Sequence, residues 1–453
     1  MRLLLLVLIP WALAAQAPAW DYSARLAPSA DSLSVEARFE PGDADRFIVD
    51  DDCAAFVKGL EREKAGRWLP VLRNAEGWDL PGAEREGAHL RWTFVLAAAS
   101  HGGRHLSGVR GQDGTWLART STFLLRPARY HPDRPARLRM AVPEGLAFLS
   151  GIHPGSEPGS WEGATEDFDD PPYSALGRWR LRSLPVQGGV IEVAEPAAGT
   201  PLDAAAADAW IRHSAALLVS AYGRFPVKRA ALFLTPVDRG SGVVFGTASG
   251  HGGAGVIVLL GHALSKADLD RDWVLPHELV HLALADLPEG HRWLEEGLPT
   301  YLEPLFRLRS GELDAKAFWA GLRKNLPQGQ PRAGDRGLDR TPTWGRTYWG
   351  GAMFCFLADL RIRERSGGRK TLLDALRGIL DAGLNAERRS DLREVLRAGD
   401  RALGFEALMP LYDALAEQSG PVDLEALWGR LGVTGSGFDD AAPESALRKA
   451  WGR

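Results

Sequence analysis

Short segments that alternate apolar and polar residues fill the first part of the chain, from about residue 20 to residue 193. Residues 90–96 and 137–142 alternate most clearly, and residues 122–125 form a shorter candidate. Clusters of Gly, Pro and Asp separate these segments, and long helical repeats are scarce. Alternation with a period of two is typical of strands that bury one face. The pattern therefore predicts an N-terminal antiparallel β-sandwich.

Behind this region the apolar spacing changes from strand-like to helical. An alanine-rich segment has helical spacing from Asp203, its expected N-cap, to Tyr222. Strands are predicted at 230–234 and 255–260, and two helices follow them. The remaining chain is helical in pattern, with a capping-box pair at Thr371 and Asp374. These features predict a multidomain α+β protein with a C-terminal α-helical region.

The first residues have the pattern of an export signal. Arg2 precedes the apolar run at 3–9, and small residues at 15–19 offer a cleavage site. The run is too short to span a bilayer, and no cysteine near the cleavage site could carry a lipid. We expect a mature protein that is periplasmic or secreted and has no stable membrane insertion.

Length and pattern together set the expected domains, because 453 residues exceed one ordinary domain. The residues after 435 are small and polar, which predicts a frayed end. We expect a signal peptide at 1–19, a β-sandwich at 20–195, a mixed domain at 196–310, an α-helical domain at 311–435 and a flexible tail at 436–453.

Charge and cysteine content narrow the possible partners and linkages. The net charge is −4 and the basic residues form no stripe, so nucleic acid is not an expected partner. Cys53 and Cys355 are the only cysteines. Because Cys355 lies in an apolar run, we expect two buried thiols in preference to one long-range disulfide.

The segment from His277 to His281 reads His-Glu-Leu-Val-His and carries the clearest chemistry. Histidines four apart leave the same face of a helix and can hold one metal ion. Glu278 leaves at roughly 100° to the first ligand and can reach a water on that metal. Three protein ligands plus a water is the catalytic zinc arrangement, whereas structural sites use four. The alternative is a surface helix with coincidental histidines.

The third ligand can be sought downstream. Leu284 and Leu287 occupy the positions where a metzincin needs Gly and His, so that class is excluded. Residues 293–301 resemble the Trp-Leu-x-Glu-Gly segment of the gluzincins, the superfamily of thermolysin and aminopeptidase N. The resemblance implies a thermolysin-like zinc catalytic domain over 196–310, with Glu296 as third ligand. Glu295 and Glu303 are the alternative ligands.

The spacing of these ligands points to a subgroup of gluzincins. Fourteen residues separate His281 from Glu296, fewer than in thermolysin or aminopeptidase N. The shorter gap resembles the peptidase MA-like and glycyl aminopeptidase families. Residues 347–352 resemble a Tyr-x-x-Gly-Ala segment of the aminopeptidase N superfamily, and residues 354–363 resemble its glycyl aminopeptidase counterpart. This resemblance implies that Tyr348 donates a hydrogen bond to the developing oxyanion. The alternative for Tyr348 is an aromatic ring that packs in the core.

A substrate-binding edge strand is expected just before the motif helix, where residues 249–257 lie. In aminopeptidases of this superfamily a glutamate in that segment binds the substrate's α-amine. Here no acidic residue lies between Gly240 and Ser265. Its glycines allow close approach of a peptide backbone, so an endopeptidase-like or relaxed cleft is expected.

Several other polar residues lie near the motif in sequence. His251 and His262 are expected to be ordinary loop or surface histidines, although either could contact substrate. Asp286 is a candidate hydrogen-bond partner for a ligating imidazole. Arg346 and the charged segment 334–340 are candidates for lining the cleft, and structural ion pairing is equally expected for them.

The sequence as a whole predicts a zinc metallopeptidase that uses a Zn²⁺ cofactor to hydrolyse a peptide or protein substrate. The alternative is a non-catalytic, zinc-containing envelope binding protein derived from a gluzincin. An intact Glu278 argues against that alternative, because a purely structural zinc site has no need of a base.

Overall fold

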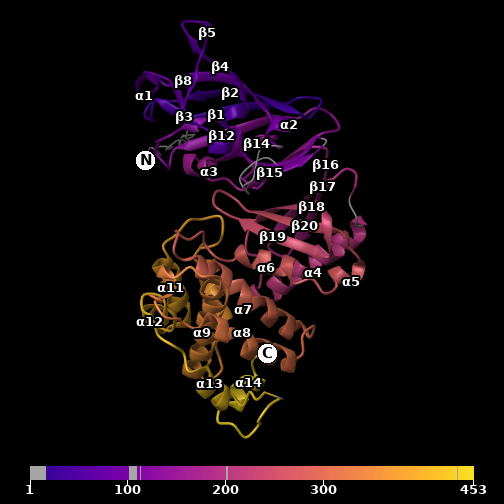
Figure 1. The fold of residues 1–453 in the computed structure, drawn as a ribbon, viewed down its shortest axis with the longest axis vertical. Helices are drawn as coiled ribbons and strands as arrows, with labels where there is room; N and C mark the ends of the chain where they lie inside the picture. The colour runs from indigo at the N-terminus through magenta and orange to yellow at the C-terminus, as the bar shows by residue number, and fades with distance from the viewer. Residues whose placement is uncertain (1–16, 101–109, 113, 200–202, 436, 453) are drawn as a thin grey trace, which may run out of the picture.

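The computed structural model describes residues 17–100, 110–112, 114–199, 203–435 and 437–452. A β-rich N-terminal part, a central mixed sheet and a C-terminal set of helices follow one another along the molecule (Figure 1). Within the described ranges, no helix combines the length and apolar composition needed to span a bilayer. The predicted signal peptide lies mostly in residues 1–16, outside those ranges.

The N-terminal part contains one seven-stranded sheet and two four-stranded sheets. The first has the order β14 (Ser160–Ala164), β12 (Pro135–Ala141), β1 (Trp20–Leu26), β2 (Ser32–Phe39), β8 (Ala88–Val95), β4 (Val57–Lys64) and β5 (Arg67–Pro70). The second has the order β13 (Ala147–Ser150), β15 (Tyr173–Gly177), β10 (Thr115–Arg119) and β9 (Arg110–Gln112). The third has the order β11 (Arg126–Pro127), β3 (Arg46–Ile48), β7 (Gly77–Asp79) and β6 (Arg73–Asn74). Short helices α1 (Ala83–Glu86), α2 (Leu96–Ala99) and α3 (Thr165–Asp169) connect strands.

The alternating apolar and polar pattern predicted the strands of the N-terminal part well where one face of the strand is buried. In β2, buried residues such as Leu33 and Val35 alternate with exposed ones, and β8 and β12 match the predicted segments. The pairing is not wholly antiparallel, because β1 and β12 run parallel. Residues 122–125 do not form the predicted strand: a 3₁₀ turn at Thr120–Thr122 leads into a buried loop. Consecutive apolar residues are all buried there, which a strand with one buried face cannot produce.

The central sheet has the order β16 (Trp179–Val186), β17 (Gly189–Pro196), β18 (Arg229–Ser241), β20 (Gly255–Ala263) and β19 (Val243–Ser249). Its three inner strands run parallel, and β16 and β19 pair antiparallel at the two edges. Because β16 and β17 belong to this sheet, the chain leaves the N-terminal part near residue 178 and not at residue 195. The edge strand is β19, whereas the predicted segment 249–257 runs from its end into the inner strand β20.

Helix α4 (Ala204–Tyr222) connects β17 to β18 and matches its prediction. The Asp203 carboxylate accepts the Ala206 N–H at 3.2 Å, which caps the first turn. Gly223 ends the helix with a positive φ of 82°.

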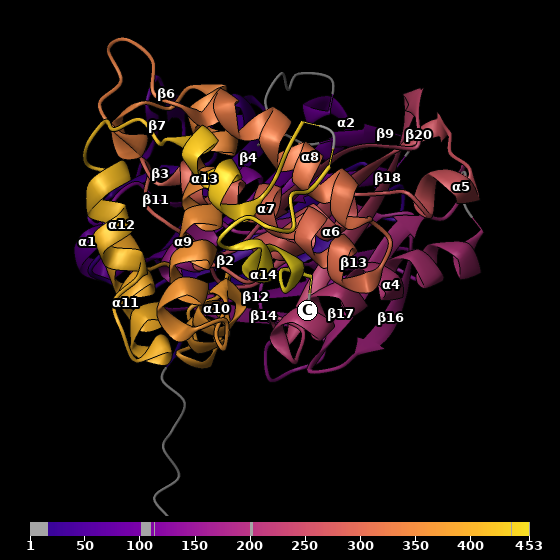
Figure 2. The ribbon, with the colours of Figure 1, turned by 90° about the horizontal axis from the view of Figure 1, so that it is seen from below.

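The rest of the described chain is mainly helical, and the capping box of Thr371 and Asp374 is present as predicted. Seen from below, α9 to α12 lie on one side of α7, and α4 with the central sheet lies on the other (Figure 2). The helices are α5 (Lys266–Leu269), α6 (Val274–His281), α7 (Arg292–Ser310), α8 (Ala315–Asn325), the π-helical turn η5 (Arg346–Gly350), α9 (Gly351–Ser366), α10 (Leu372–Asp381), α11 (Leu392–Leu403), α12 (Leu408–Leu415), α13 (Leu424–Leu431) and α14 (Ser445–Lys449).

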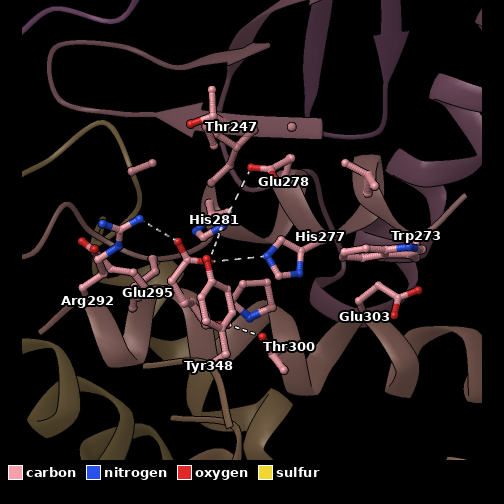
Figure 3. A pocket seen from close by; sticks show the side chains of 18 of the residues that line it. Thr247, Trp273, His277, Glu278, His281, Arg292, Glu295, Thr300, Glu303 and Tyr348 are labelled. Carbon is pink, nitrogen blue, oxygen red and sulfur yellow. Dashed lines mark hydrogen bonds and ion pairs between the residues drawn. The ribbon is translucent and has the colours of Figure 1, made fainter. Parts of the chain in front are cut away.

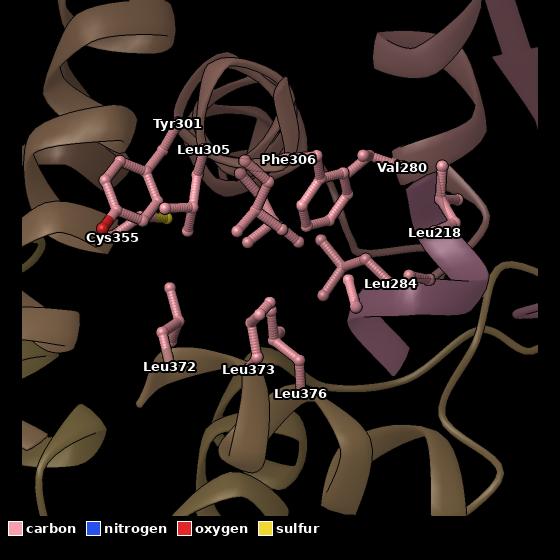
Figure 4. Close-up of a cluster of buried hydrophobic side chains, with 14 of the residues drawn as sticks. Leu218, Val280, Leu284, Tyr301, Leu305, Phe306, Cys355, Leu372, Leu373 and Leu376 are labelled. Atoms are coloured by element: carbon pink, nitrogen blue, oxygen red, sulfur yellow. The ribbon is translucent and has the colours of Figure 1, made fainter. Parts of the chain in front are cut away.

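Three hydrophobic cores hold these parts together. The largest runs from the central sheet through α4, α6 and α7 to α10, so packing continues across the predicted boundary at 310 (Figure 4). A second fills the N-terminal part, and a third lies between β10, β15 and the central sheet. Cys53 and Cys355 are buried thiols in two different cores, as predicted, so they form no disulfide with each other.

The flexible tail predicted for 436–453 is instead folded against the helices over 437–452. Trp451 is 0% exposed, and its indole N–H donates to the Tyr301 hydroxyl at 3.0 Å. The Arg363 guanidinium lies 4.4 Å from the centre of the Trp451 ring. One large aromatic side chain near the end of the chain therefore anchors a segment whose composition predicted fraying.

Candidate metal centre and cleft

Helix α6 presents its two histidines to one side and its apolar residues to the core. The Asp272 carboxylate accepts the backbone N–H groups of Val274 and Leu275 at 2.9 and 3.0 Å, and so caps the helix. Leu275 and Leu279 are buried in the large core. His277 and His281 therefore face the cleft together (Figure 3).

Helix α7 brings Glu296 to the two imidazoles. Glu296 Oε2 lies 3.7 Å from His277 Nε2 and 4.0 Å from His281 Nε2. Two atoms that bind one zinc at about 2.0–2.2 Å cannot lie more than about 4.4 Å apart, so both pairs fit a single ion. Among the described residues, these three form the one group of possible metal ligands whose donor atoms all lie within 4.8 Å. Two nitrogens and one carboxylate oxygen are the donor set of a catalytic zinc site.

The charge states of these groups suit metal binding. Burial, together with neighbouring His277, lowers the pKa of His281 to about 4, so its imidazole is neutral at pH 7. Burial alone would raise the pKa of Glu296, but the hydrogen bond to His277 and the charge of both imidazoles lower it overall. A neutral imidazole and an ionised carboxylate are the forms that bind zinc.

The two alternative ligands lie elsewhere on α7. The Glu295 carboxylate accepts the Leu287 N–H at 3.3 Å, and burial raises its pKa to about 7. Glu303 lies two turns beyond Glu296, where Arg307 donates to it at 3.4 Å. Neither carboxylate belongs to the ligand group. The structure thus brings Glu296, and not its neighbours, to the histidines.

Glu278 lies between the histidine pair and the edge strand β19. Its Oε2 is 3.9 Å from His281 Nε2, and the residue is 7% exposed. Burial, and then the charge of Glu296, raise the pKa of Glu278 to about 8. A Cβ on Gly246 of β19 would lie 2.4 Å from Glu278 Cγ, so only glycine leaves room there.

Tyr348 reaches the site from the π-helical turn η5, directly before α9. Its ring packs on Trp344 with centroids 5.7 Å apart. Burial raises the pKa of Tyr348, and the charge of Glu296 raises it further, because the hydroxyl faces that carboxylate. Single π-helical turns are frequent at functional sites, and this one directs the phenol into the cleft (Figure 3).

The site opens into a cleft of about 1190 Å³. The strand β19 forms one wall, α6 and α7 form the base, and α8 with η5 closes the other side. Arg119 and Asp170 of the N-terminal part also reach its lining. A cleft of this size, with an edge strand beside the metal ligands, can hold an extended peptide.

The other polar candidates have different positions. His251 is buried in the cleft lining, 3.6 Å from Asp167, whereas His262 is exposed outside the lining. Asp286 pairs with Arg389 at 2.7 Å and not with a ligating imidazole. Arg346 is buried against Asp335 at 2.9 Å, and the segment 334–340 is not among the described residues of the lining. Arg346 therefore forms the expected structural ion pair, and it is not among the described residues that line the cleft.

Sequence reasoning missed three residues of the site. Arg292 lies 3.6 Å from Glu296 Oε1, so it holds the oxygen that does not face the imidazoles. Its position four residues before Glu296 on a helix could have indicated that pair. Gly246 and Trp273 had no comparable signal, because the strand and the helix start that position them were not predicted in detail.

No protein-family model matches the chain, and no curated protein sequence matches it. Solved structures do match. An aminopeptidase N family protein from Idiomarina loihiensis has a TM-score of 0.66 at 14% identity, over 91% of this chain and 78% of that one. A variant of the M1 zinc metallopeptidase from Deinococcus radiodurans has a TM-score of 0.51 at 20% identity, over 89% of this chain and 94% of that one. Another Deinococcus structure, with a Tyr-Ser-Ala substrate bound, has a TM-score of 0.51 at 19% identity, over 89% and 94% of the two chains.

These matches show that the chain shares its fold with an aminopeptidase N family protein and with an M1 zinc metallopeptidase. The chain has the multidomain architecture of the M1 zinc metallopeptidases, with a β-rich N-terminal region and a helical C-terminal region. The gluzincin resemblance of the sequence is thereby confirmed at the level of the fold.

Proposed function

We propose that this chain is a zinc-dependent metallopeptidase that hydrolyses peptide bonds. The observation that carries the proposal is the convergence of His277, His281 and Glu296 on one point at the base of a large cleft. A buried carboxylate, Glu278, stands beside that point. Three ligands with one open position and an adjacent base are what metal-assisted hydrolysis requires.

Each residue of the site has its own role in the proposed reaction. Bound zinc supplies Lewis acidity, which lowers the pKa of a water from about 15.7 toward about 7. Glu278, whose ionised form the charge of bound zinc would favour, accepts the proton of the attacking water and passes it to the leaving amine, a role worth roughly 10²–10⁴ in rate. Tyr348 donates a hydrogen bond to the carbonyl oxygen as it gains charge. The free edge of β19 pairs with the substrate backbone.

The substrate is a peptide or protein segment in extended form. The Deinococcus enzyme that holds a Tyr-Ser-Ala peptide supports this choice, because its fold is shared over most of both chains. The predicted export signal supports a periplasmic or extracellular location for the reaction. The lack of an acidic residue on β19 favours recognition that does not depend on a free α-amine.

The test compares the purified protein with its Glu278→Gln variant. We expect about one bound zinc per chain in both, hydrolysis of a mixed peptide library by the first only, and loss of that hydrolysis on chelation. Hydrolysis by Glu278→Gln at the original rate would refute the role of the base. Bound zinc without hydrolysis in either protein would favour the non-catalytic envelope binding protein.

A further inference from the structure

The cleft continues beyond the metal centre on the side of α8. In Figure 3, Trp273 and Glu303 lie on one side of His277, opposite Arg292. Phe245 of β19 and two residues of α8, Phe318 and Leu322, also line the cleft. These five lining residues are called here the α8 subsite.

Two of the three exposed aromatic rings that line the cleft in the described part of the chain belong to the α8 subsite. Phe245 is 43% exposed and Trp273 is 53% exposed, and the third ring, Trp344, packs on Tyr348. Exposed aromatic rings grouped in a concave site are typical of a surface that binds a ligand. Phe318 and Leu322 lie behind them in the core, at 2% and 3% exposed.

Glu303 is the one charged side chain among the described residues that line the α8 subsite. Around Glu303 acidic groups outnumber basic ones, and a bound cation would favour its ionised form. Arg307 lies 3.4 Å from Glu303 but also 3.9 Å from Glu312, and the buried carboxylate of Asp272 acts on Glu303 as well. His213 contacts Glu312 from outside, at 3.2 Å. Three carboxylates therefore share one guanidinium beneath the apolar walls.

We propose that the α8 subsite binds a lysine or arginine side chain of the peptide substrate. The methylene stem of such a side chain would lie against the aromatic and aliphatic walls. Its cationic head would contact the Trp273 ring and the Glu303 carboxylate. An aromatic substrate side chain would fill the same walls but leave the excess negative charge uncompensated. The inference rests on the proposed peptidase function and adds the substrate class.

The direction of β19 assigns this side chain to a position in the substrate. The strand runs from Val243, beside Phe245, past Gly246 at the base Glu278, to Ser249. Antiparallel addition is the commoner pairing of β-strands. A peptide bound in that way leaves the cleft on the Val243 side. The basic side chain then belongs to the residue on the carboxyl side of the cleaved bond.

The test measures binding, so that it does not depend on turnover. Zinc-loaded Glu278→Gln protein is titrated with two capped peptides that differ only in lysine or norleucine, which has a similar stem without charge. We expect the lysine peptide to bind at least about tenfold more tightly than the norleucine peptide. When Glu303→Gln is added to the same protein, the ratio of the two affinities should fall to near one. Glu289→Gln is the matched control, because Glu289 is an exposed acid that lines the cleft outside the α8 subsite. The ratio of the two affinities should be unchanged in that variant.

A second variant keeps the test decisive if Glu303→Gln fails to fold. Trp273→Leu changes an exposed ring and should weaken binding of the lysine peptide more than binding of the norleucine peptide. Equal affinity of the unaltered subsite for both peptides would overturn the inference. Hydrolysis of other peptides would then still support the peptidase function, so the two failures are distinguishable.

Discussion

At the scale of residues, two adjacent glutamates on α7 show that a shift of one position along a helix changes what a side chain contacts. Glu295 and Glu296 leave the helix about 100° apart. One carboxylate therefore accepts the Leu287 N–H, and the other faces both imidazoles. Both residues are glutamates, so helix phase separates the carboxylate that faces the two imidazoles from the one that fixes a loop.

This difference in phase leads to a paired prediction. Glu296→Gln should lower zinc affinity by at least about tenfold, because an amide is a weaker zinc ligand than a carboxylate. Glu295→Gln should leave zinc affinity close to that of the original protein. Competition with a zinc-binding dye measures both. Equal losses in the two variants would contradict the assignment of Glu296.

The raised pKa of Glu303 leads to a second prediction, on how the free energy of unfolding changes with pH. Burial raises its pKa from 4.5 to about 7 in the folded protein. Between these values the folded state holds a proton that the unfolded state has lost, so this group lowers the free energy of unfolding as pH rises. Glu303→Gln removes that loss, an effect on the order of 3 kcal/mol at most. Denaturant unfolding at pH 5 and pH 8 should show an advantage of the variant that grows with pH, and a constant difference would contradict the prediction.

At the scale of elements, close backbone contacts position the catalytic groups. A Cβ on Gly297 of α7 would lie 2.3 Å from the backbone of Gly351, at the start of α9. The two helices can therefore approach closely beside Glu296, and the turn η5 before α9 carries Tyr348 to that carboxylate. On the opposite side, Gly246 of β19 makes the corresponding space for Glu278.

Gly246→Ala should separate metal binding from catalysis. The added methyl group would overlap Glu278 and displace the base, and a displacement of about 1 Å can reduce activity by roughly 100-fold. Zinc content should be unchanged, because the ligands lie on α6 and α7. Peptide hydrolysis and metal analysis together provide the measurement. Gly429→Ala, where nothing lies within 4 Å of the added Cβ, is the control and should retain full activity.

The elements that could be predicted are those with a regular pattern in one environment. The segments that became α4, α6 and α7 showed helical spacing or a motif, and Glu296 followed from resemblance. The strand β19 was missed because Gly246, Thr247 and Ser249 are small or polar and mostly half-buried, so they do not alternate. The strands β16 and β17 were assigned to the wrong part, because alternation shows a buried face but not which sheet it faces. The π-helical turn at Tyr348 depends on tertiary packing that no local pattern reveals.

At the scale of the whole molecule, the end of the chain contributes to the same core as the site. Trp451 packs on Trp319 and Phe356, and its N–H joins a buried network in which Tyr301 donates to Asp359 at 2.8 Å. Tyr301 belongs to α7, one turn and a half beyond Glu296. The packing of Trp451 therefore supports the helix that carries the proposed third ligand.

Trp451→Ala should destabilise the protein by about 3–5 kcal/mol, because it leaves a large cavity and removes one of the two hydrogen bonds of the Tyr301 hydroxyl. Thermal and denaturant unfolding measure the loss. Leu72→Ala, at a side chain that is 85% exposed, is the control and should change stability little. A small effect of Trp451→Ala would indicate that the tail is not anchored as described.

The third hydrophobic core has a mechanical consequence. Leu117 and Tyr173 of the N-terminal part pack there with Phe233 and Ile257 of the central sheet. Swinging these two parts away from each other would expose that apolar surface to water, at about 25 cal/mol for each Å². Arg119 and Asp170 of the N-terminal part, which line the cleft, are therefore held in place relative to the central sheet. Under the proposed function, widening the cleft for a folded substrate would carry this cost, whereas an extended or unfolded chain would avoid it.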